Sequence, residues 1–461
     1  MRILFIILAA SISFFCNAQN IKRKGSLGVG LYNILPDSIS QKLNLKVTNG
    51  AMVQFVVPKS TSDIIGIKQN DFITDINNKP INNTSELISI ARQFRADDDL
   101  FVTLIRDNTS IKLKGKVVSK PFEESQIADI IYGEFKFETG YIRTLYKKPK
   151  NKKIVGTVYF IQGISCYSLD NMQPLDPTKL AIDAILEKGF AVYSVEKSCI
   201  GDSYGVIPCA EMGFDKELAI FREGYKNLLS NPDIDSTAIF VFGHSLGGVS
   251  APLIAQEFSP KGIIVYGTVL KPWGEYYQET LVLQPLLYGE NLKELNKKLA
   301  IMKPTFNEIF KTNKPIDKLA SDPKHLQNLK DGIEYNETTK LAAAGRTIQF
   351  HREINGHDLV KAWKNVNAYT LAIYGECDIA ANNDKDHKAI IKIVNKYHPK
   401  KGTYLLMPKT NHTFQEVGSM AEYIALQKNP IEYEKYASQH FNSKLFEKVC
   451  DWMNDKLTKK L

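Results

Sequence analysis

From about residue 121 to the C-terminus, short apolar runs alternate with longer stretches of helical periodicity. The apolar runs are rich in Val, Ile, Phe and Tyr and are four to six residues long, which is typical of strands buried on both faces. Stretches such as 179–188 and 216–229 place apolar residues at helical spacing between them. This alternation predicts an α/β domain with a mostly parallel sheet over residues 121–461. The predicted strands are 156–161, 190–195, 238–242, 262–266, 369–374 and 403–406.

Residues 20–118 have a different pattern. A strand punctuated by glycine is expected at 26–31, and a turn-rich apolar segment follows over 63–81. A helix is predicted from Thr84, with Asn83 or Thr84 as its cap and Leu87 on its apolar face. We therefore expect a small β-rich domain before the larger one.

One interval in the larger domain is too long for an ordinary crossover. About a hundred residues, 269–367, separate two predicted strands, which indicates an inserted helical cap. Within it an apolar stripe recurs at helical spacing and is most simply the packing face of the cap. Four aromatic residues are alternative candidates for lining a substrate cavity. The stripe is Leu292, Leu295, Leu299, Met302 and Phe306, and the aromatic residues are Trp273, Tyr276, Tyr277 and Trp363.

Length and composition fit a globular protein of two domains, because the chain has 461 residues, 44% apolar residues and 24% charged residues. Its net charge of +9 is spread widely and accompanies no nucleic-acid motif, so no nucleic-acid partner is expected.

Residues 1–18 resemble a secretory signal peptide. Arg2 precedes an apolar run at 3–15, and Asn17 and Ala18 offer a cleavage site. Cys16 would suit a lipoprotein, but bulky residues precede it, and the apolar run is short for an uncleaved anchor. We expect export to the periplasm or the medium without stable membrane insertion.

Export would permit disulfides. Cys199 and Cys209 lie ten positions apart and could form a local bond. Cys166 should lie nearby and could pair with either of them, so the pairing stays open.

The segment from Gly243 to Gly247 has the sequence G-H-S-L-G, which fits the G-x-S-x-G nucleophile elbow. An apolar strand precedes it, and small and then apolar residues typical of a closely packed helix follow it. Such a strand–turn–helix exposes the central side chain above the sheet, so Ser245 is the predicted nucleophile.

A serine hydroxyl needs a base and the base needs an orienting carboxylate. Asp378 directly follows one predicted strand and His412 follows the next, in the order Ser–acid–His of α/β-hydrolases. We predict Asp378 as the acid and His412 as the base, with Glu376 in reserve. The other histidines form no convincing zinc set, and neither a metal nor a cofactor is expected.

These motifs make residues 121–461 resemble the α/β-hydrolase fold, and most closely exported hydrolases of the serine aminopeptidase-like group. The resemblance implies an oxyanion hole made by the N–H of Leu246 and by the turn after the first parallel strand. That turn carries Gln162 where the family commonly has histidine, and Ile164, then Gly163, are the predicted donors. The loop 196–205 resembles a further structural turn of the family.

Residues 20–118 resemble a PDZ domain of the bacterial envelope-protease type. The resemblance rests on the sequence from Gly66 to Lys68 and on that from Asp71 to Ile73. Asn70 stands in place of the usual glycine. The resemblance implies that backbone N–H groups of Leu27, Gly28 and Val29 bind the C-terminal carboxylate of a peptide. The alternative is a domain that has lost this ability and only orients its neighbour.

Together these features predict an exported serine hydrolase that cleaves carboxylic esters or short peptide amides through an acyl-enzyme, with the ester favoured. One alternative is a serine peptidase or aminopeptidase guided by the PDZ-like domain. The other is a non-catalytic peptide-binding protein on a relic hydrolase fold.

Overall fold

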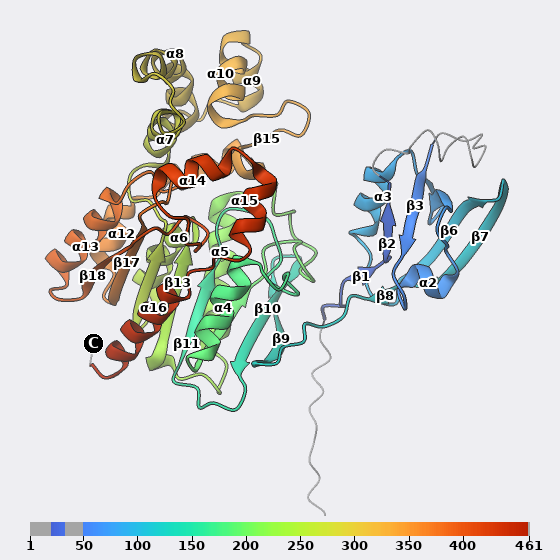
Figure 1. Ribbon diagram of the computed structural model, residues 1–461, viewed down its shortest axis with the longest axis horizontal. Coiled ribbons are helices and arrows are strands. Elements are labelled where there is room, and N and C mark those ends of the chain that lie inside the picture. Colours follow the sequence, from blue (N-terminus) through green and yellow to red (C-terminus); the bar gives the residue numbers. More distant parts are fainter. Residues whose placement is uncertain (1–19, 33–48, 460–461) are drawn as a thin grey trace, which may run out of the picture.

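A computed structural model describes residues 20–32 and 49–459 of the chain (Figure 1). The signal peptide predicted for residues 1–18 lies outside the described residues. The described residues form a six-stranded sheet in a small N-terminal domain and an eight-stranded sheet in a large C-terminal domain, and two further sheets have only two strands each. In Figure 1 the small domain stands beside the large one and is joined to it at β1 and β8.

The large domain is built on an eight-stranded sheet with the order β18-β17-β14-β13-β11-β12-β10-β9. β9 and β10 form an antiparallel hairpin, and β10 pairs antiparallel with β12, whereas the other neighbours are parallel. β11 lies between β12 and β13, which is the arrangement of the α/β-hydrolase fold, so the predicted fold class is confirmed. The strands are β9 (Ala128–Phe137), β10 (Gly140–Pro149), β11 (Gly156–Ile161), β12 (Phe190–Val195), β13 (Ile239–His244), β14 (Gly262–Tyr266), β17 (Tyr369–Gly375) and β18 (Gly402–Met407).

Helices cover both faces of this sheet, which is why its central strands β11, β13 and β14 are buried at every position and mostly apolar. Side chains alternate along β11: Val158 and Phe160 join one core, and Tyr159 and Ile161 join the other. The first core is closed by α4 (Pro177–Glu187) and α16 (Ser443–Leu457). The second core is closed by α5 (Phe214–Leu229), α6 (Gly247–Phe258), α12 (Leu359–Asn365) and α13 (Lys385–Tyr397). The remaining short helices of the domain are η1 (Ser236–Ala238), α14 (Met420–Gln427) and α15 (Pro430–Ala437).

The chain between β14 and β17 is helical, as predicted for an insertion. Figure 1 shows α7 to α10 grouped together and set apart from the sheet. α12 instead packs against α6 and α13, and the predicted cavity candidate Trp363 is buried in the core there. The elements are α7 (Trp273–Leu287), α8 (Leu292–Lys311), α9 (Ile316–Ala320), α10 (Pro323–Ile333), β15 (Leu341–Ala342), η2 (Ala343–Gly345), β16 (Arg346–Thr347) and α11 (Ile348–Gly356).

The apolar stripe of α8 is only partly a packing face. Leu295 and Phe306 are buried, but Leu292 at the first turn is 48% exposed. The periodicity therefore located the helix correctly, although the first turn of the stripe is exposed.

In the small domain, the strand predicted at 26–31 is divided into two short strands that pair in different sheets, because Gly28 between them has a left-handed φ of 72°. The predicted helix begins after Asn83, whose side chain accepts a hydrogen bond from the N–H of Glu86 at 2.9 Å. Asn70 adopts the left-handed conformation, with φ of 69°. The elements are β1 (Gly25–Ser26), β2 (Val29–Leu31), β3 (Ala51–Val56), α2 (Thr61–Ile65), β4 (Phe72–Ile76), β5 (Lys79–Pro80), α3 (Thr84–Ala91), β6 (Asp99–Arg106), β7 (Thr109–Lys116) and β8 (Val118–Ser119).

A buried ion cluster attaches the start of the small domain to the large one. The guanidinium of Arg23 contacts Asp170 at 2.5 Å and Asp202 at 2.8 Å, and Arg143 donates to the same Asp202 carboxylate at 3.2 Å. All four side chains are at most 5% exposed, so each charge depends on the others for solvation.

Among the described residues, no helix is both long and apolar enough to span a membrane.

Candidate active site

Ser245 occupies the sharp turn between β13 and α6. Its φ is 55°, a left-handed value that is unusual for a serine, and its N–H donates to the carbonyl of Tyr266 at 2.9 Å. A Cβ at Gly247 would collide with the carbonyl of Ile161, and one at Gly243 would collide with Gly247. The two glycines of the motif are therefore required by the close approach of β11, β13 and α6.

His412 and Asp378 are brought together from separate loops at the ends of β18 and β17. The Nδ1 atom of His412 lies 2.9 Å from Oδ1 and 2.8 Å from Oδ2 of Asp378. Oδ1 also accepts the N–H of Ala381 at 2.9 Å, which fixes the orientation of the carboxylate. The Asp378 side chain is fully buried, whereas that of His412 is 19% exposed. A histidine held in this way presents its Nε2 atom on the side away from the acid.

The two groups shift each other's ionisation. Burial by itself would raise the pKa of Asp378, but the charge and hydrogen bond of His412 outweigh it, so this pKa is lowered. Burial would lower the pKa of His412, but Asp378 outweighs it and raises that pKa above its ordinary value of 6.5. His412 is therefore a stronger base than a free imidazole.

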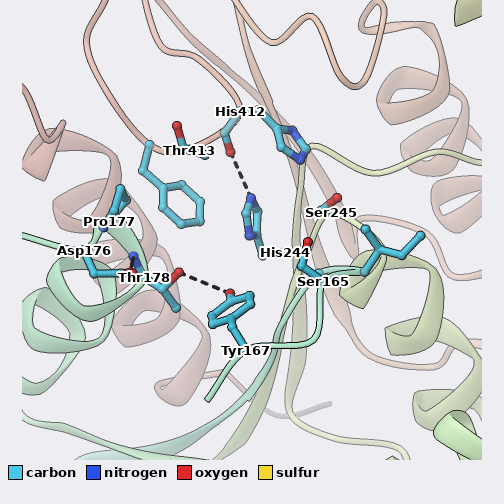
Figure 2. A pocket seen from close by; sticks show the side chains of 12 residues that line it. Ser165, Tyr167, Asp176, Pro177, Thr178, His244, Ser245, His412 and Thr413 are labelled. Carbon is cyan, nitrogen blue, oxygen red and sulfur yellow. Dashed lines mark hydrogen bonds between the residues drawn. The ribbon is translucent and has the colours of Figure 1, made fainter. Parts of the chain in front are cut away.

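Ser245 and His412 line one cavity of about 370 Å³, and Figure 2 shows the two side chains on the same side of it. The exposed surface of the walls is largely apolar, and of the described residues no lysine or arginine lines them. None of the lining residues comes from the inserted helices, so the aromatic candidates Trp273, Tyr276, Tyr277 and Trp363 are not part of this cavity. The lining residues are Gly163, Ile164, Ser165, Tyr167, Asp176, Pro177, Thr178, His244, Ser245, His412, Thr413 and Phe414.

The residues predicted for an oxyanion hole surround Ser245. Leu246 directly follows it and is the N-cap of α6, and Gly163 is close enough that a Cβ there would lie 3.2 Å from the Cβ of Ser245. Among the described residues, the N–H groups of Leu246, Gly163 and Ile164 take part in no internal hydrogen bond. These three donors are therefore available to a ligand in the cavity.

Two further residues support the site and were missed in the sequence. The Nε2 atom of His244 donates to the carbonyl of His412 at 2.9 Å, as drawn in Figure 2. Burial, with a smaller contribution from His412, lowers the pKa of His244 to about 3, so its ring is neutral. Gly267 has φ of 63°, and a Cβ there would lie 2.6 Å from Oδ2 of Asp378 and 2.7 Å from Nδ1 of His412. His244 lies inside the elbow motif, but no local pattern identifies Gly267.

The other candidates from the sequence lie outside this arrangement. The Glu376 carboxylate accepts the N–H of Lys409 at 2.8 Å and is exposed, so it does not face His412.

The disulfide joins Cys166 to Cys209, and Cys199 is free, so the local Cys199–Cys209 pairing is not the one formed. Over residues 20–32 and 49–459, no group of histidine, cysteine or acidic side chains could hold a metal ion.

A second hollow, of about 400 Å³, lies between β2 and α3 of the small domain. Leu27, Gly28 and Val29 line it, as do Ile88 on α3 and Ser168 of the large domain. Gly28 has φ of 72°, and a side chain there would collide with Ser60. The predicted carboxylate-binding loop therefore borders a groove. We call this hollow the β2–α3 groove.

Comparison with known proteins places a PDZ domain at residues 25–117, which match the family described as PDZ domain. A probable periplasmic serine endoprotease DegP-like of Rickettsia conorii is 33% identical over 96 residues, 21% of this chain and 19% of that protein. The periplasmic pH-dependent serine endoprotease DegQ of Escherichia coli is 40% identical over 67 residues, 14% of each chain. The chain thus spans about a fifth of the length of these curated relatives, or less.

Solved structures with some likeness are distant. Est1E from Butyrivibrio proteoclasticus with bound ferulic acid is 14% identical, with a TM-score of 0.44, covering 71% of this chain and 100% of that one. A carboxyl esterase from Bacillus coagulans in complex with glycerol is 15% identical, with a TM-score of 0.42 and coverage of 71% and 99%. An acylaminoacyl peptidase from Pyrococcus horikoshii is 14% identical, with a TM-score of 0.40 and coverage of 76% and 50%. The fold of the large domain is established by its own strand order and elbow.

Proposed function

We propose that this protein is a serine hydrolase that cleaves carboxylic esters through an acyl-enzyme. The observation that carries the proposal is the contact of His412 Nδ1 with both oxygens of the buried Asp378, beside a serine in a strained elbow. A buried carboxylate that raises the basicity of an imidazole next to a hydroxyl is the arrangement that activates a serine.

The reaction follows from these positions. Ser245 Oγ attacks the carbonyl carbon while Nε2 of His412 takes the hydroxyl proton, and Asp378 stabilises the imidazolium that forms. The N–H groups of Leu246 and Ile164, with Gly163 in reserve, stabilise the negative charge on the carbonyl oxygen. The proton then passes from His412 to the leaving alcohol, and the acyl group stays on Ser245. Water, activated by His412, releases the acid and restores the serine.

The cavity restricts the substrate. Its volume of about 370 Å³ suits a small acyl group, and Ile164, Tyr167 and Phe414 favour an apolar or aromatic one. Because no cation lines the cavity and Asp176 does, an acyl group with a negative charge should be rejected.

Export is part of the proposal. The apolar segment at residues 3–15 and the Cys166–Cys209 disulfide support it, because disulfides persist in oxidising compartments. The matched relatives named above are described as periplasmic serine proteases.

The test is labelling by a fluorophosphonate probe together with hydrolysis of p-nitrophenyl acetate. The native protein should react with both, and Ser245→Ala should lose labelling and at least about 10⁴-fold in kcat. Ser165→Ala is the matched control, because Ser165 also lines the cavity and is exposed, and this variant should keep its labelling. Absence of labelling in the native protein would instead favour the peptide-binding protein on a relic fold.

Asp176 favours a second candidate, an aminopeptidase that acts on short peptide amides. Its carboxylate caps α4 by accepting the N–H of Thr178 at 2.8 Å, and it also lines the cavity. A single acidic side chain could bind the ammonium group of an aminoacyl substrate. Higher kcat/KM for aminoacyl p-nitroanilides than for p-nitrophenyl esters, with the preference lost in Asp176→Ser, would select this candidate.

For the PDZ domain we propose binding of a peptide C-terminus in the β2–α3 groove. The glycine-containing turn at Leu27, Gly28 and Val29 would receive the carboxylate, while Lys24 and Arg92 line the same hollow and favour an anion. The alternative, in which the domain only orients the large one, is consistent with the buried cluster at Arg23 and predicts no peptide binding.

A further inference from the structure

Two buried cations donate hydrogen bonds to the carbonyls of the turn that carries Gly163 and Ile164. The ammonium of Lys197 donates to the carbonyl of Gly163 at 2.6 Å and to that of Ile164 at 3.1 Å. The guanidinium of Arg346 donates to the carbonyl of Ile164 at 3.0 Å. Both cationic side chains are fully buried.

These contacts fix the orientation of the peptide between Gly163 and Ile164. The carbonyl of Gly163 and the N–H of Ile164 belong to one planar trans peptide and point in opposite directions. Lys197 binds this carbonyl and is not among the residues that line the cavity, whereas Ile164 and Ser245 are, so the N–H of Ile164 is directed away from Lys197 and towards the cavity. The hydrogen bond also polarises the peptide and makes its N–H a stronger donor.

The charge of the two cations is only partly neutralised. Glu217 on α5 is 3.1 Å from Lys197 and 2.8 Å from Arg346, and it is the acidic group that pairs with both of them. Burial lowers the pKa of Lys197 to about 8, although Glu217 opposes this, so the ammonium form prevails at neutral pH. A buried charge that is not fully paired needs dipoles, and the carbonyls of the turn supply them.

The same turn is tied down by a covalent bond. Cys166 follows the turn and forms the disulfide with Cys209, whose Sγ atom is 3.3 Å from Nη1 of Arg346. Arg346 begins β16 in the inserted segment and packs its guanidinium over the ring of Phe350, with 3.7 Å between Cζ and the ring centroid. The insertion thus reaches the site through Arg346, behind the turn, and not through the walls of the cavity.

We propose that Lys197 and Arg346 are positioning residues for the oxyanion hole, because they hold the Gly163–Ile164 turn with its carbonyls away from Ser245 and the N–H of Ile164 towards it. The proposal rests on the proposed hydrolase function. Neither cation is among the residues that line the cavity, so we expect their effect to be on the stability of the transition state and not on substrate binding.

The test compares Lys197→Met with Lys147→Met. Lys147 is a matched control, because its buried ammonium also pairs with a glutamate, Glu123, at 2.7 Å, but it lies on β10 and contacts neither Gly163 nor Ile164. With p-nitrophenyl acetate, Lys197→Met should lose about 10²-fold in kcat with KM changed less than about threefold. The Kd of a trifluoromethyl ketone, which forms an oxyanion on Ser245, should rise by about the same factor. Lys147→Met should leave both quantities within about threefold of native.

A second variant covers the case in which Lys197→Met does not fold. Arg346→Lys keeps a positive charge beside Glu217 but is too short to hold the carbonyl of Ile164 in the same way, and should lose about tenfold in kcat and in ketone affinity. Native kcat and native ketone affinity in whichever of these variants folds would overturn the proposal, as would equal losses in Lys197→Met and Lys147→Met. If the native protein is not labelled at Ser245, the proposed function itself fails. If the native protein is labelled but kcat and ketone affinity are unchanged in Lys197→Met and Arg346→Lys, only this inference fails.

Discussion

The cavity beside Ser245 and the β2–α3 groove are similar in size, about 370 Å³ and about 400 Å³, yet they are built for different tasks. Each borders a glycine-containing turn. The cavity also has an ionisable pair, His412 and Asp378, held 2.8 Å apart, whereas the residues lining the groove include neither a histidine nor a carboxylate. Instead, Lys24, Arg92 and Lys120 line the groove.

The difference shows what separates a reactive site from a binding site in one chain. Backbone donors can bind a carboxylate or stabilise an oxyanion equally well, because both are oxygen anions. The buried, coupled acid and base turn the cavity into a candidate for catalysis. The following changes affect one region and leave the other as an internal reference.

The largest effect is expected from Asp378→Asn. The amide cannot stabilise the imidazolium and can favour the wrong tautomer of His412, so kcat should fall about 10⁴-fold for p-nitrophenyl acetate. Glu376→Gln, two residues earlier, should keep native kcat because the exposed carboxylate of Glu376 accepts the N–H of Lys409 and has no hydrogen bond to His412. Similar losses in both variants would contradict the assignment of the acid.

Gly267→Ala should come next, with a loss of about 10²-fold in kcat. The added methyl group would lie 2.6 Å from Asp378 and 2.7 Å from His412 and would force them apart. Gly289→Ala separates this effect from backbone strain, since Gly289 also has a positive φ, 91°, but a Cβ there meets no atom within 4 Å. Both variants should lower Tm, and only Gly267→Ala should lower kcat. A native kcat in Gly267→Ala would show that the pair tolerates displacement.

The pH dependence should show a base that is stronger than a free imidazole. Neutral His412 is the active form, and Asp378 raises its pKa, so kcat/KM should rise with pH through a value above 6.5 and fall tenfold per pH unit below it. The protonated pair stabilises the fold fully below pH 6.5 and loses this contribution as pH rises through the raised pKa, so activity and stability should change in opposite directions. In Asp378→Asn burial alone acts, and the residual activity should titrate below 6.5. If the pH at which kcat/KM rises is the same in Asp378→Asn as in the native protein, His412 is excluded as the titrating group.

The smallest effect, about tenfold, is expected in the groove. Ile88→Asp places a negative charge on the α3 wall of the groove that is proposed to bind a peptide carboxylate, and should weaken binding of a fluorescent hexapeptide that ends in valine with a free carboxylate. Ile64→Asp is the control, since Ile64 is 65% exposed and lies on α2 outside the groove. Neither change should alter kcat. Equal binding of the peptide and its C-terminal amide would favour a domain that only orients its neighbour.

The elements of the large domain could be predicted well because their signals are local. Every strand proposed from an apolar run is present in the sheet. In the small domain the sequence left Asn83 and Thr84 open as the helix cap and the structure selects Asn83, while Asn70 has the left-handed conformation that asparagine tolerates. The β9–β10 hairpin was not predicted. β9 lies at the edge of the sheet, where exposed and buried positions mix, and β10 is largely buried but includes Arg143 and Lys147, so neither strand forms a continuous apolar run.

The sequence by itself determined the elbow, because the glycines around Ser245 can be recognised from spacing within five residues. It also placed Asp378 and His412 after successive strands, since parallel strands end at one edge of a sheet. Only the tertiary structure decided which cysteine pairs with Cys166 and that Gly267 must lack a side chain beside the acid and base. The same holds for Lys197 and Arg346, which come from different parts of the chain to one turn. Such contacts depend on how distant segments pack, and no periodicity along the chain records that packing.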